Sequence, residues 1–294
     1  MGVFQFGTNL RYNQHTKQWI AYHIKETFVW NPDQPTLAHR LSGTVHGISE
    51  DGQYMLFTAN HLLEAASCEK VPITQERMAR FSLGQRTIVR ITNYGVMAHE
   101  VTAKTKILKF PEEVKPLPGT GVRQGIDSAV ISPNGRFLAV AFSAEGGGFE
   151  NMWGAVYTLD KEKLYRVSIN RFANPLFHFS ADSKLLAVNP RDRTIHILNS
   201  ATGQVVTTIA QYDTPRIALL PQADDLLFAY RDGRNEWKLA NTEGVLATHK
   251  EEDRIAALAF AEDTHLGVLL NNGRINVYQL TDMRRTQTYR WADE

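Results

Sequence analysis

The chain has 294 residues, of which 32 are Lys or Arg and 31 are Asp or Glu, so its formal net charge is +1. Hydrophobic residues make up 43% and charged residues 21%, values that exclude a disordered chain. With 20 glycines, 11 prolines and 1 cysteine, the composition also excludes collagen-like and disulfide-stapled chains. The near-neutral balance argues against a protein that wraps nucleic acid electrostatically, so we expect no nucleic acid as a direct ligand.

Sorting signals are missing from the sequence. The first residues lack the apolar core and small-residue cleavage site of a secretory signal. No window approaches roughly 18 uninterrupted apolar residues, the length that a membrane-spanning helix needs. We therefore expect a cytoplasmic protein with no membrane partner, and a mature chain whose signal has been removed is the alternative.

A short phrase recurs along the chain, made of an apolar run, a polar turn and a second apolar run. It reads HGISEDGQYMLFTA, AVISPNGRFLAVAF and FHFSADSKLLAVNP, with degenerate copies ALLPQADDLLFAYR and LAFAEDTHLGVLLN. Successive equivalent positions are 83, 48, 41 and 40 residues apart: Ser49, Ser132, Ser180, Pro221 and Ala261. The first gap is close to two units, and dividing 294 by about 42 gives seven units. Their predicted starts are Leu10, Thr44, Arg86, Ile126, Pro175, Pro215 and Arg254.

The clearest unit predicts four antiparallel strands, at Leu176–Phe179, Leu185–Val188, Thr194–Leu198 and Val205–Ile209. Asp, Ser and Gly occupy the turns between them. The first two strands are apolar at nearly every residue, which indicates burial on both faces. Sheets stacked face to face around an axis supply that burial. The sequence therefore predicts an all-β fold, a seven-bladed β-propeller of four-stranded antiparallel blades in a single domain over residues 1–294, with six blades as the alternative.

The second half of this unit, LAVNPRDRTIHILNSATGQVVTTI, resembles a WD40 repeat. Asp192 falls where that family keeps its turn Asp, and Leu198-Asn199 falls where it keeps Trp-Asp. Trp30-Asn31 and the segment NGRINVY from Asn272 match the same stretch.

The Gly-His element of the family has weaker counterparts. Gly43-Thr44 and Gly119-Thr120 stand in its place, and His249 is the best candidate for a retained His. The sequence contains no complete Gly-His plus Trp-Asp pair. The resemblance nevertheless extends over essentially the whole chain, and it implies a rigid platform for protein–protein interaction.

Two regions break the period. Residues 61–85 are rich in Ala, Leu and Glu and predict an insert with short helical pieces, packed against the propeller through its apolar side chains: Leu62, Leu63, Ile73, Met78 and Phe81. Residues 109–125 are rich in Pro and Gly and predict an irregular loop. At the ends of the chain, Val3–Phe6 is expected to supply the outer strand of the last unit, with Thr286–Trp291 as its competitor.

Signatures of common enzymes are missing. The sequence has no P-loop, HExxH, CxxC or GxSxG motif. Cys68 lies beside Glu69-Lys70, and a nearby Lys could lower its thiol pKa, but the sequence offers no catalytic partner. Acidic turn residues such as Asp51, Asp182 and Asp192 suggest either calcium ligands or turn-holding side chains, and the second interpretation is favoured. We expect no enzyme activity, no metal and no cofactor.

Charged residues near the start of several inner strands are the candidate contacts for a partner. Arg is enriched at interface hot spots, and propeller folding does not require Arg at these places. The predicted function is a non-catalytic interaction scaffold, a subunit of a larger complex with unidentified protein partners. The alternative is a propeller enzyme or small-ligand binder that uses the mouth of the central channel. The candidate partner-binding residues are Arg123, Arg171, Arg216, Arg254, Asp213 and Asp253.

Overall fold

The chain was analysed as a computed structural model, and its described residues form β-strands joined by turns and short connections. These described residues contain no helix, which confirms the prediction of an all-β fold. The residues that the structure describes are 9–14, 16–23, 26–31, 37–43, 45–48, 53–57, 61–71, 81–84, 87–92, 95–100, 105–109, 123–145, 152–159, 163–169, 177–180, 182–189, 194–210, 217–222 and 225–290.

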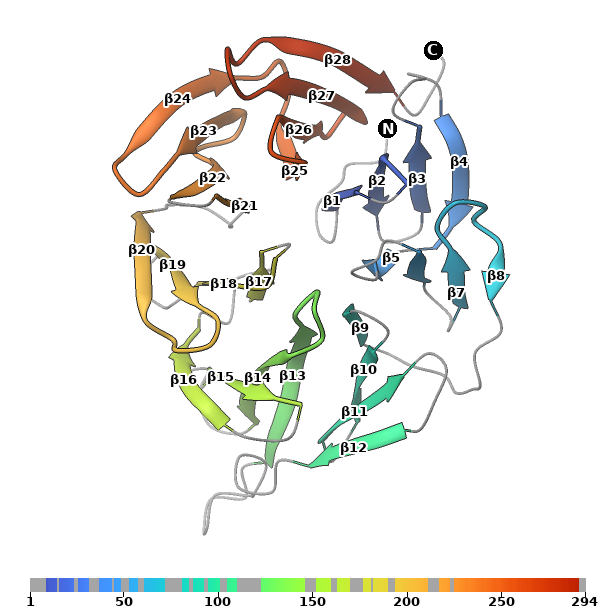
Figure 1. Ribbon diagram of the computed structural model, residues 1–294, viewed down its shortest axis with the longest axis vertical. Helices are drawn as coiled ribbons and strands as arrows, with labels where there is room; N and C mark the ends of the chain where they lie inside the picture. The colour runs from blue at the N-terminus through green and yellow to red at the C-terminus, as the bar shows by residue number, and fades with distance from the viewer. Residues whose placement is uncertain are drawn as a thin grey trace. The chain divides into compact units, whose positions relative to one another are not determined.

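The strands form four-stranded antiparallel sheets, and the chain divides into two compact units. The first unit comprises Met1–Val45, Asp51–Val71 and Tyr212–Glu294, and the second comprises His46–Glu50 and Pro72–Gln211. Each predicted repeat start lies within a few residues of the first strand of a sheet. In every sheet the strands lie side by side in chain order (Figure 1).

The strands assigned mainly to the first unit belong to sheets from both ends of the chain. The N-terminal sheet contains β1 (Asn9–Asn13), β2 (Gln18–His23), β3 (Glu26–Trp30) and β4 (Leu37–Ser42). The next contains β5 (Val45–Ile48), β6 (Tyr54–Phe57), β7 (His61–Glu64) and β8 (Lys70–Val71). The two C-terminal sheets contain β21 (Ile217–Pro221), β22 (Leu226–Arg231), β23 (Glu236–Ala240) and β24 (Val245–Lys250), and then β25 (Ile255–Ala261), β26 (His265–Leu270), β27 (Arg274–Gln279) and β28 (Arg285–Arg290).

The second unit contains the sheets from the middle of the chain. The first of them is formed by β9 (Phe81–Gly84), β10 (Thr87–Thr92), β11 (Gly95–Glu100) and β12 (Thr105–Lys109). It is followed by β13 (Arg123–Ile131), β14 (Phe137–Glu145), β15 (Met152–Thr158) and β16 (Lys163–Ser168). The last contains β17 (Phe177–Phe179), β18 (Leu185–Val188), β19 (Thr194–Asn199) and β20 (Val205–Ala210), close to the bounds predicted from the sequence.

The turn between the first two strands is built in the same way in neighbouring repeats. Ser132 Oγ donates to Asn134 Oδ1 at 2.8 Å and accepts from the Phe137 amide at 2.9 Å. One repeat later, Ser180 Oγ donates to Asp182 Oδ1 at 2.7 Å and accepts from the Leu185 amide at 3.0 Å. These bonds replace missing backbone partners in a tight turn. The interpretation of Asp182 as a turn-holding residue is therefore confirmed.

A second repeated feature is a β-bulge near the end of the third strand, where its pairing with the outer strand shifts register. A bulge locally bends the strand and re-aims its side chains. Two of these bulges fall at Trp30 and Leu198, the positions that resemble the Trp of the WD40 Trp-Asp pair. The shifts occur at Val29/Trp30, Val156/Tyr157, Ile197/Leu198, Leu239/Ala240 and Val277/Tyr278.

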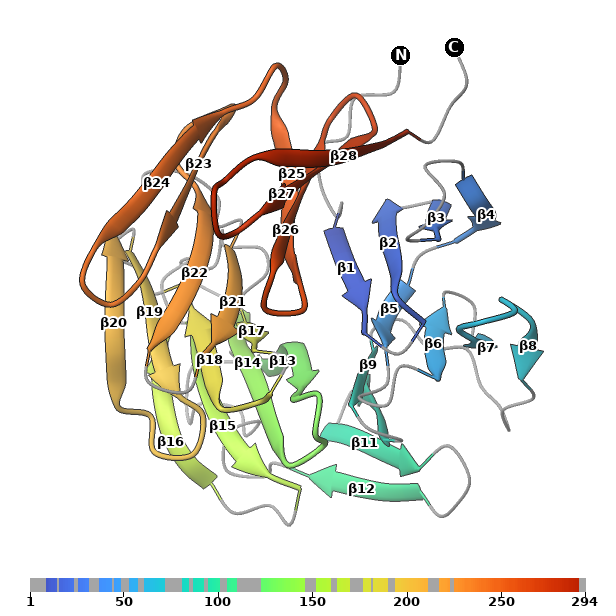
Figure 2. The same cartoon turned by 45° about the horizontal axis from the view of Figure 1, so that its top comes forward.

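Within each unit, successive sheets bury apolar side chains against one another. In the second unit, Ala139, Ala141 and Val156 pack with Phe177 and Leu186 of the next sheet. In the first unit, the sheets β21–β24 and β25–β28 share one core cluster, and the sheets β25–β28 and β1–β4 share another. All four residues of β18 and all six of β22 are buried, as expected for strands covered on both faces. Figure 2 shows the strands of sheet β21–β24 lying side by side.

In the described part of the predicted insert at residues 61–85, strands stand where short helical pieces were expected, and residues 72–80 lie outside the described ranges. His61–Glu64 is strand β7 and Lys70–Val71 is strand β8, and β7 pairs with both β6 and β8. Local Ala, Leu and Glu content favours a helix, but pairing to a preformed edge satisfies the backbone of this segment as a strand. Leu63 is buried, as expected. The side chains of Leu62, Ile73, Met78 and Phe81 lie outside the described part.

The described residues include only part of the predicted loop 109–125 and only part of the segments proposed for the outer strand of the last sheet. In the loop predicted at 109–125, Arg123–Ile131 is strand β13, and residues 110–122 lie outside the described ranges. The outer strand of the last sheet is Arg285–Arg290, which pairs with β27. The competing C-terminal segment therefore takes this place, and the assignment of Val3–Phe6 to it is wrong. Val3–Phe6 itself lies outside the described residues.

Replacing Gly267 by Ala tests the close approach between two sheets of the first unit. A Cβ at this position would overlap the six-membered ring of Trp19, so Gly267→Ala should lower the free energy of unfolding by about 1–3 kcal/mol. Trp19→Phe removes the overlapping atoms. The cost of Gly267→Ala, measured by urea unfolding, should therefore be smaller in the Trp19→Phe background. Equal costs in the two backgrounds would contradict this packing.

Candidate functional site

The loop between β24 and β25, formed by Glu251, Glu252, Asp253 and Arg254, is tied to two neighbouring loops. The Glu251 amide donates to Asn235 O at 2.8 Å, and the Asn271 amide donates to Arg254 O at 2.9 Å. The Asn235 side-chain amide donates back to Glu251 O at 2.8 Å. These bonds fix the backbone on which the predicted contact residues Asp253 and Arg254 stand.

A buried carboxylate anchors the loop. Glu251 is 5% exposed and accepts hydrogen bonds from three side chains. Trp237 Nε1 and Tyr278 OH donate to its Oε1 at 2.9 and 2.8 Å, and Asn276 Nδ2 donates to its Oε2 at 2.8 Å. Hydrogen bonds to an ionised acceptor are stronger than those between neutral groups. Because Trp237 lies in β23 whereas Asn276 and Tyr278 lie in β27, this single carboxylate connects two sheets.

Aromatic rings pack around the anchor. His249 stacks on Trp237 with ring centroids 4.9 Å apart, and Tyr278 lies 5.3 Å from His249 and 5.2 Å from Trp237. Burial raises the pKa of Tyr278 above its ordinary value, and its hydrogen bond to Glu251 adds to the shift. Its hydroxyl therefore keeps its proton at neutral pH and remains a donor to the carboxylate.

The structure places His249, the candidate for the His of the family's Gly-His element, in an aromatic stack. His249 lies on the outer strand β24 and contributes a stacked ring. Side chains of the third strands donate hydrogen bonds to Glu251, two residues later. In the sequence, the only indication of this role of Glu251 is the acidic run at 251–253, which lies between an outer and an inner strand. Its partners are 14, 25 and 27 residues away in the sequence, which local reading does not reveal.

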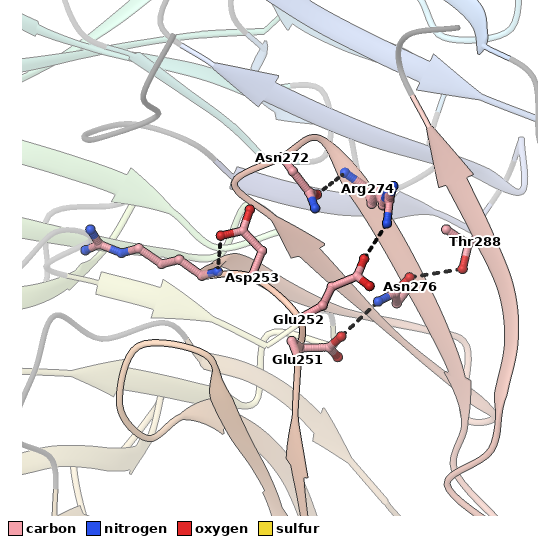
Figure 3. A network of polar contacts seen from close by, with 8 residues as sticks. Glu251, Glu252, Asp253, Asn272, Arg274, Asn276 and Thr288 are labelled. Atoms are coloured by element: carbon pink, nitrogen blue, oxygen red, sulfur yellow. Dashed lines mark hydrogen bonds and ion pairs between the residues drawn. The ribbon is translucent and has the colours of Figure 1, made fainter. Parts of the chain in front are cut away.

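The network continues from Glu251 to the outer strand and to the next loop, as Figure 3 shows. Asn276 Oδ1 accepts from Thr288 Oγ1 at 3.0 Å, which extends the chain of bonds to β28. Arg274 Nη1 donates to Glu252 Oε1 at 2.6 Å, and the Arg274 amide donates to Asn272 Oδ1 at 3.1 Å. The polar groups of this loop are thus held in one defined arrangement.

An additional arginine, Arg231, binds the backbone of Ile255, the residue that follows the loop. It is 2% exposed, and its Nη1 donates to Ile255 O at 3.1 Å. Sequence reasoning missed Arg231, because it considered arginines before inner strands and this residue ends the second strand β22. Because this buried guanidinium donates to the first residue of β25, Arg231 holds the start of that strand in place.

The predicted partner-binding residues are covered only in part. Asp253 and Arg254 lie in the described loop, where the Arg254 amide donates to Asp253 Oδ1 at 2.6 Å. Arg123 begins β13 and pairs through its backbone with Glu145, and its side chain lies outside the described part. The remaining predicted contacts also lie outside it: Arg171, Arg216 and Asp213. Of the six predicted partner-binding residues, the structure therefore describes the side chains of Asp253 and Arg254.

Two chemical alternatives from the sequence can be compared with the geometry. Among the described residues, no group of three or more His, Cys, Asp or Glu side chains could hold a metal ion. Cys68 lies in the turn between β7 and β8, and burial raises the pKa of its thiol to about 11. The thiol is therefore protonated at neutral pH, contrary to the activation by Lys70 that the sequence suggested. Within the described ranges, no helix has the length and hydrophobicity needed to cross a membrane.

Comparisons with known proteins establish the fold. No protein-family model and no curated protein matches the sequence. Among solved structures, the Myceliophteria thermophila Swd1 β-propeller domain is similar with a TM-score of 0.66 at 13% identity, over 95% of this chain and 99% of that one. A chain of the mitotic checkpoint complex gives a TM-score of 0.58 at 16% identity, over 97% and 86%. The dihydro-haem d1 dehydrogenase NirN in complex with DHE gives 0.57 at 13% identity, over 96% and 63%.

Removal of the Glu251 carboxylate should destabilise the fold much more than removal of its exposed neighbour. Glu251→Ala leaves three buried donors without an acceptor, so we expect a loss of about 3 kcal/mol or more in the free energy of unfolding. Glu252→Ala is the matched control, because a solvent-exposed ion pair contributes at most about 1 kcal/mol. Urea unfolding of both variants measures the difference. Similar losses for the two variants would contradict the anchoring role of Glu251.

Proposed function

We propose that this chain, which folds as a WD40-like β-propeller, is a non-catalytic scaffold that binds protein partners as a subunit of a larger complex. We also propose that its sheets form seven blades of one domain, as the repeat spacing predicts, and that it acts in the cytoplasm. The observation that carries the functional proposal is the loop 251–254, in which a buried anchor holds charged residues in a fixed arrangement.

The physical argument concerns preorganisation. Ordering a flexible loop on binding costs free energy, and a loop that is already fixed avoids much of that cost. The Glu251 network fixes the backbone at Arg254, a residue type enriched at interface hot spots. A chain with this fold from the mitotic checkpoint complex is consistent with a role in assemblies. The likeness to a dehydrogenase supports keeping the enzyme alternative in the test, because fold alone does not decide function.

Affinity purification of the tagged full-length chain, followed by mass spectrometry and light scattering, tests the scaffold proposal. A stoichiometric protein partner in a complex of defined mass is the expected result. A chain that purifies alone under mild conditions and turns over a small molecule would favour the enzyme instead.

The predicted contact surface is tested with a variant in which Arg123, Arg171, Arg216 and Arg254 are all replaced by Ala. Desolvated arginine contacts can each be worth about 2 kcal/mol at an interface, so capture of the partner should weaken at least about tenfold. The midpoint of thermal unfolding should change little, since the blade cores are apolar. Undiminished capture by a folded variant would place the binding surface elsewhere.

A further inference from the structure

Two arginines are brought together where the loop between β22 and β23 meets the loop before β25. The Ile255 amide donates to Arg234 O at 3.1 Å, so the residue next to Arg254 is bonded directly to Arg234. Arg234 is exposed and Arg254 is half-buried. Neither guanidinium forms an ion pair or a side-chain hydrogen bond with any part of the chain that the structure describes.

The acidic residues around them already have other partners. Glu252 is bound by Arg274 at 2.6 Å, and Asp232 is bound by Lys238. Glu251 accepts from three buried donors and faces the protein interior. Asp253 accepts from the backbone amide of Arg254. These carboxylates are therefore engaged with other groups, and the two arginine side chains carry two positive charges on adjacent segments.

The backbones that carry the two arginines are fixed. The carbonyl of Arg254 accepts from the Asn271 amide, and Asn235, the residue after Arg234, exchanges two hydrogen bonds with Glu251. A planar guanidinium matches the two oxygens of a carboxylate and can bind it through two parallel hydrogen bonds. Two guanidinium groups on a fixed backbone suit a pair of neighbouring carboxylates better than a single one.

We propose that Arg234 and Arg254 form a docking site for an acidic segment of a protein partner, with two carboxylates close together in its sequence. This inference rests on the proposed scaffold function and names the chemistry of its partner. A nucleic acid fits less well, because it is a long polyanion whose binding depends on many contacts between phosphates and basic side chains, whereas this site offers two arginines. The net charge of +1 supplies no general attraction for such a polyanion.

A phage-displayed library of random dodecapeptides, selected on the full-length chain, tests the proposal. We expect the enriched peptides to contain two Asp or Glu residues within a few positions of each other. Their affinity, measured by fluorescence anisotropy, should fall at least about tenfold for the double variant Arg234→Ala/Arg254→Ala and should decrease with added salt. The matched control is Arg284→Ala/Arg285→Ala, which removes the same charge from exposed residues near and on the outer strand β28 and should leave the affinity unchanged.

Several outcomes would overturn the site. Peptides enriched without an acidic bias would do so, and so would acidic peptides that bind the double variant as well as the native chain. Binding of single-stranded DNA or phosphatidylserine vesicles through the two arginines, without binding of acidic peptides, would assign the site to another class of ligand. A native partner that the double variant still captures fully would leave the scaffold intact and remove this site. A chain that captures neither a partner nor a peptide would contradict the scaffold itself.

Discussion

Strands that are apolar on both faces impose the main constraint on this molecule. A single four-stranded sheet leaves such strands half exposed, so each sheet must be covered on two sides. The structure meets this requirement within each unit by packing one sheet against the next. In the first unit, the sheet β25–β28 shares apolar clusters with β21–β24 and with β1–β4. The fully buried strand β22 shows how complete this coverage becomes.

Close packing of sheets leaves little room for polar groups. Buried polar groups without partners cost free energy, so a carboxylate inside this stack needs several donors. Glu251 has them from two different sheets. Its hydrogen bonds therefore have two effects at once. They connect the third strands β23 and β27 of two sheets, and they hold the loop that joins the two sheets.

The sequence predicted the parts of the fold that depend on neighbours in the chain. The strands of the unit from Phe177 to Ala210 follow from apolar runs separated by Asp, Ser and Gly turns, and the serine turns repeat at Ser132 and Ser180. The expectation of helical pieces was wrong for His61–Glu64, because local composition does not show the edge of β6 to which this segment pairs. The same limit applies to the site. Arg254 and Asp253 were found from their position before an inner strand, whereas Glu251, Arg231 and Arg234 acquire their roles from residues that only the folded chain brings close.

The division of charges around the loop 251–254 links the fold to the proposed function. The buried charged residues stabilise the fold: Glu251 accepts hydrogen bonds from neutral donors, and Arg231 donates to the start of β25. Pairing also occupies Glu252. The positive charges on Arg234 and Arg254 are exposed or half-buried and have no acidic partner among the described residues, so the apolar sheets do not require them. The same hydrogen bonds that stabilise the sheet junction also position these two arginines. A change at the buried anchor Glu251 therefore alters both the stability of the fold and the position of the arginines. A change at the arginines themselves alters only the contacts that they offer to a partner. Binding through the arginines can therefore change while the sheet junction stays intact.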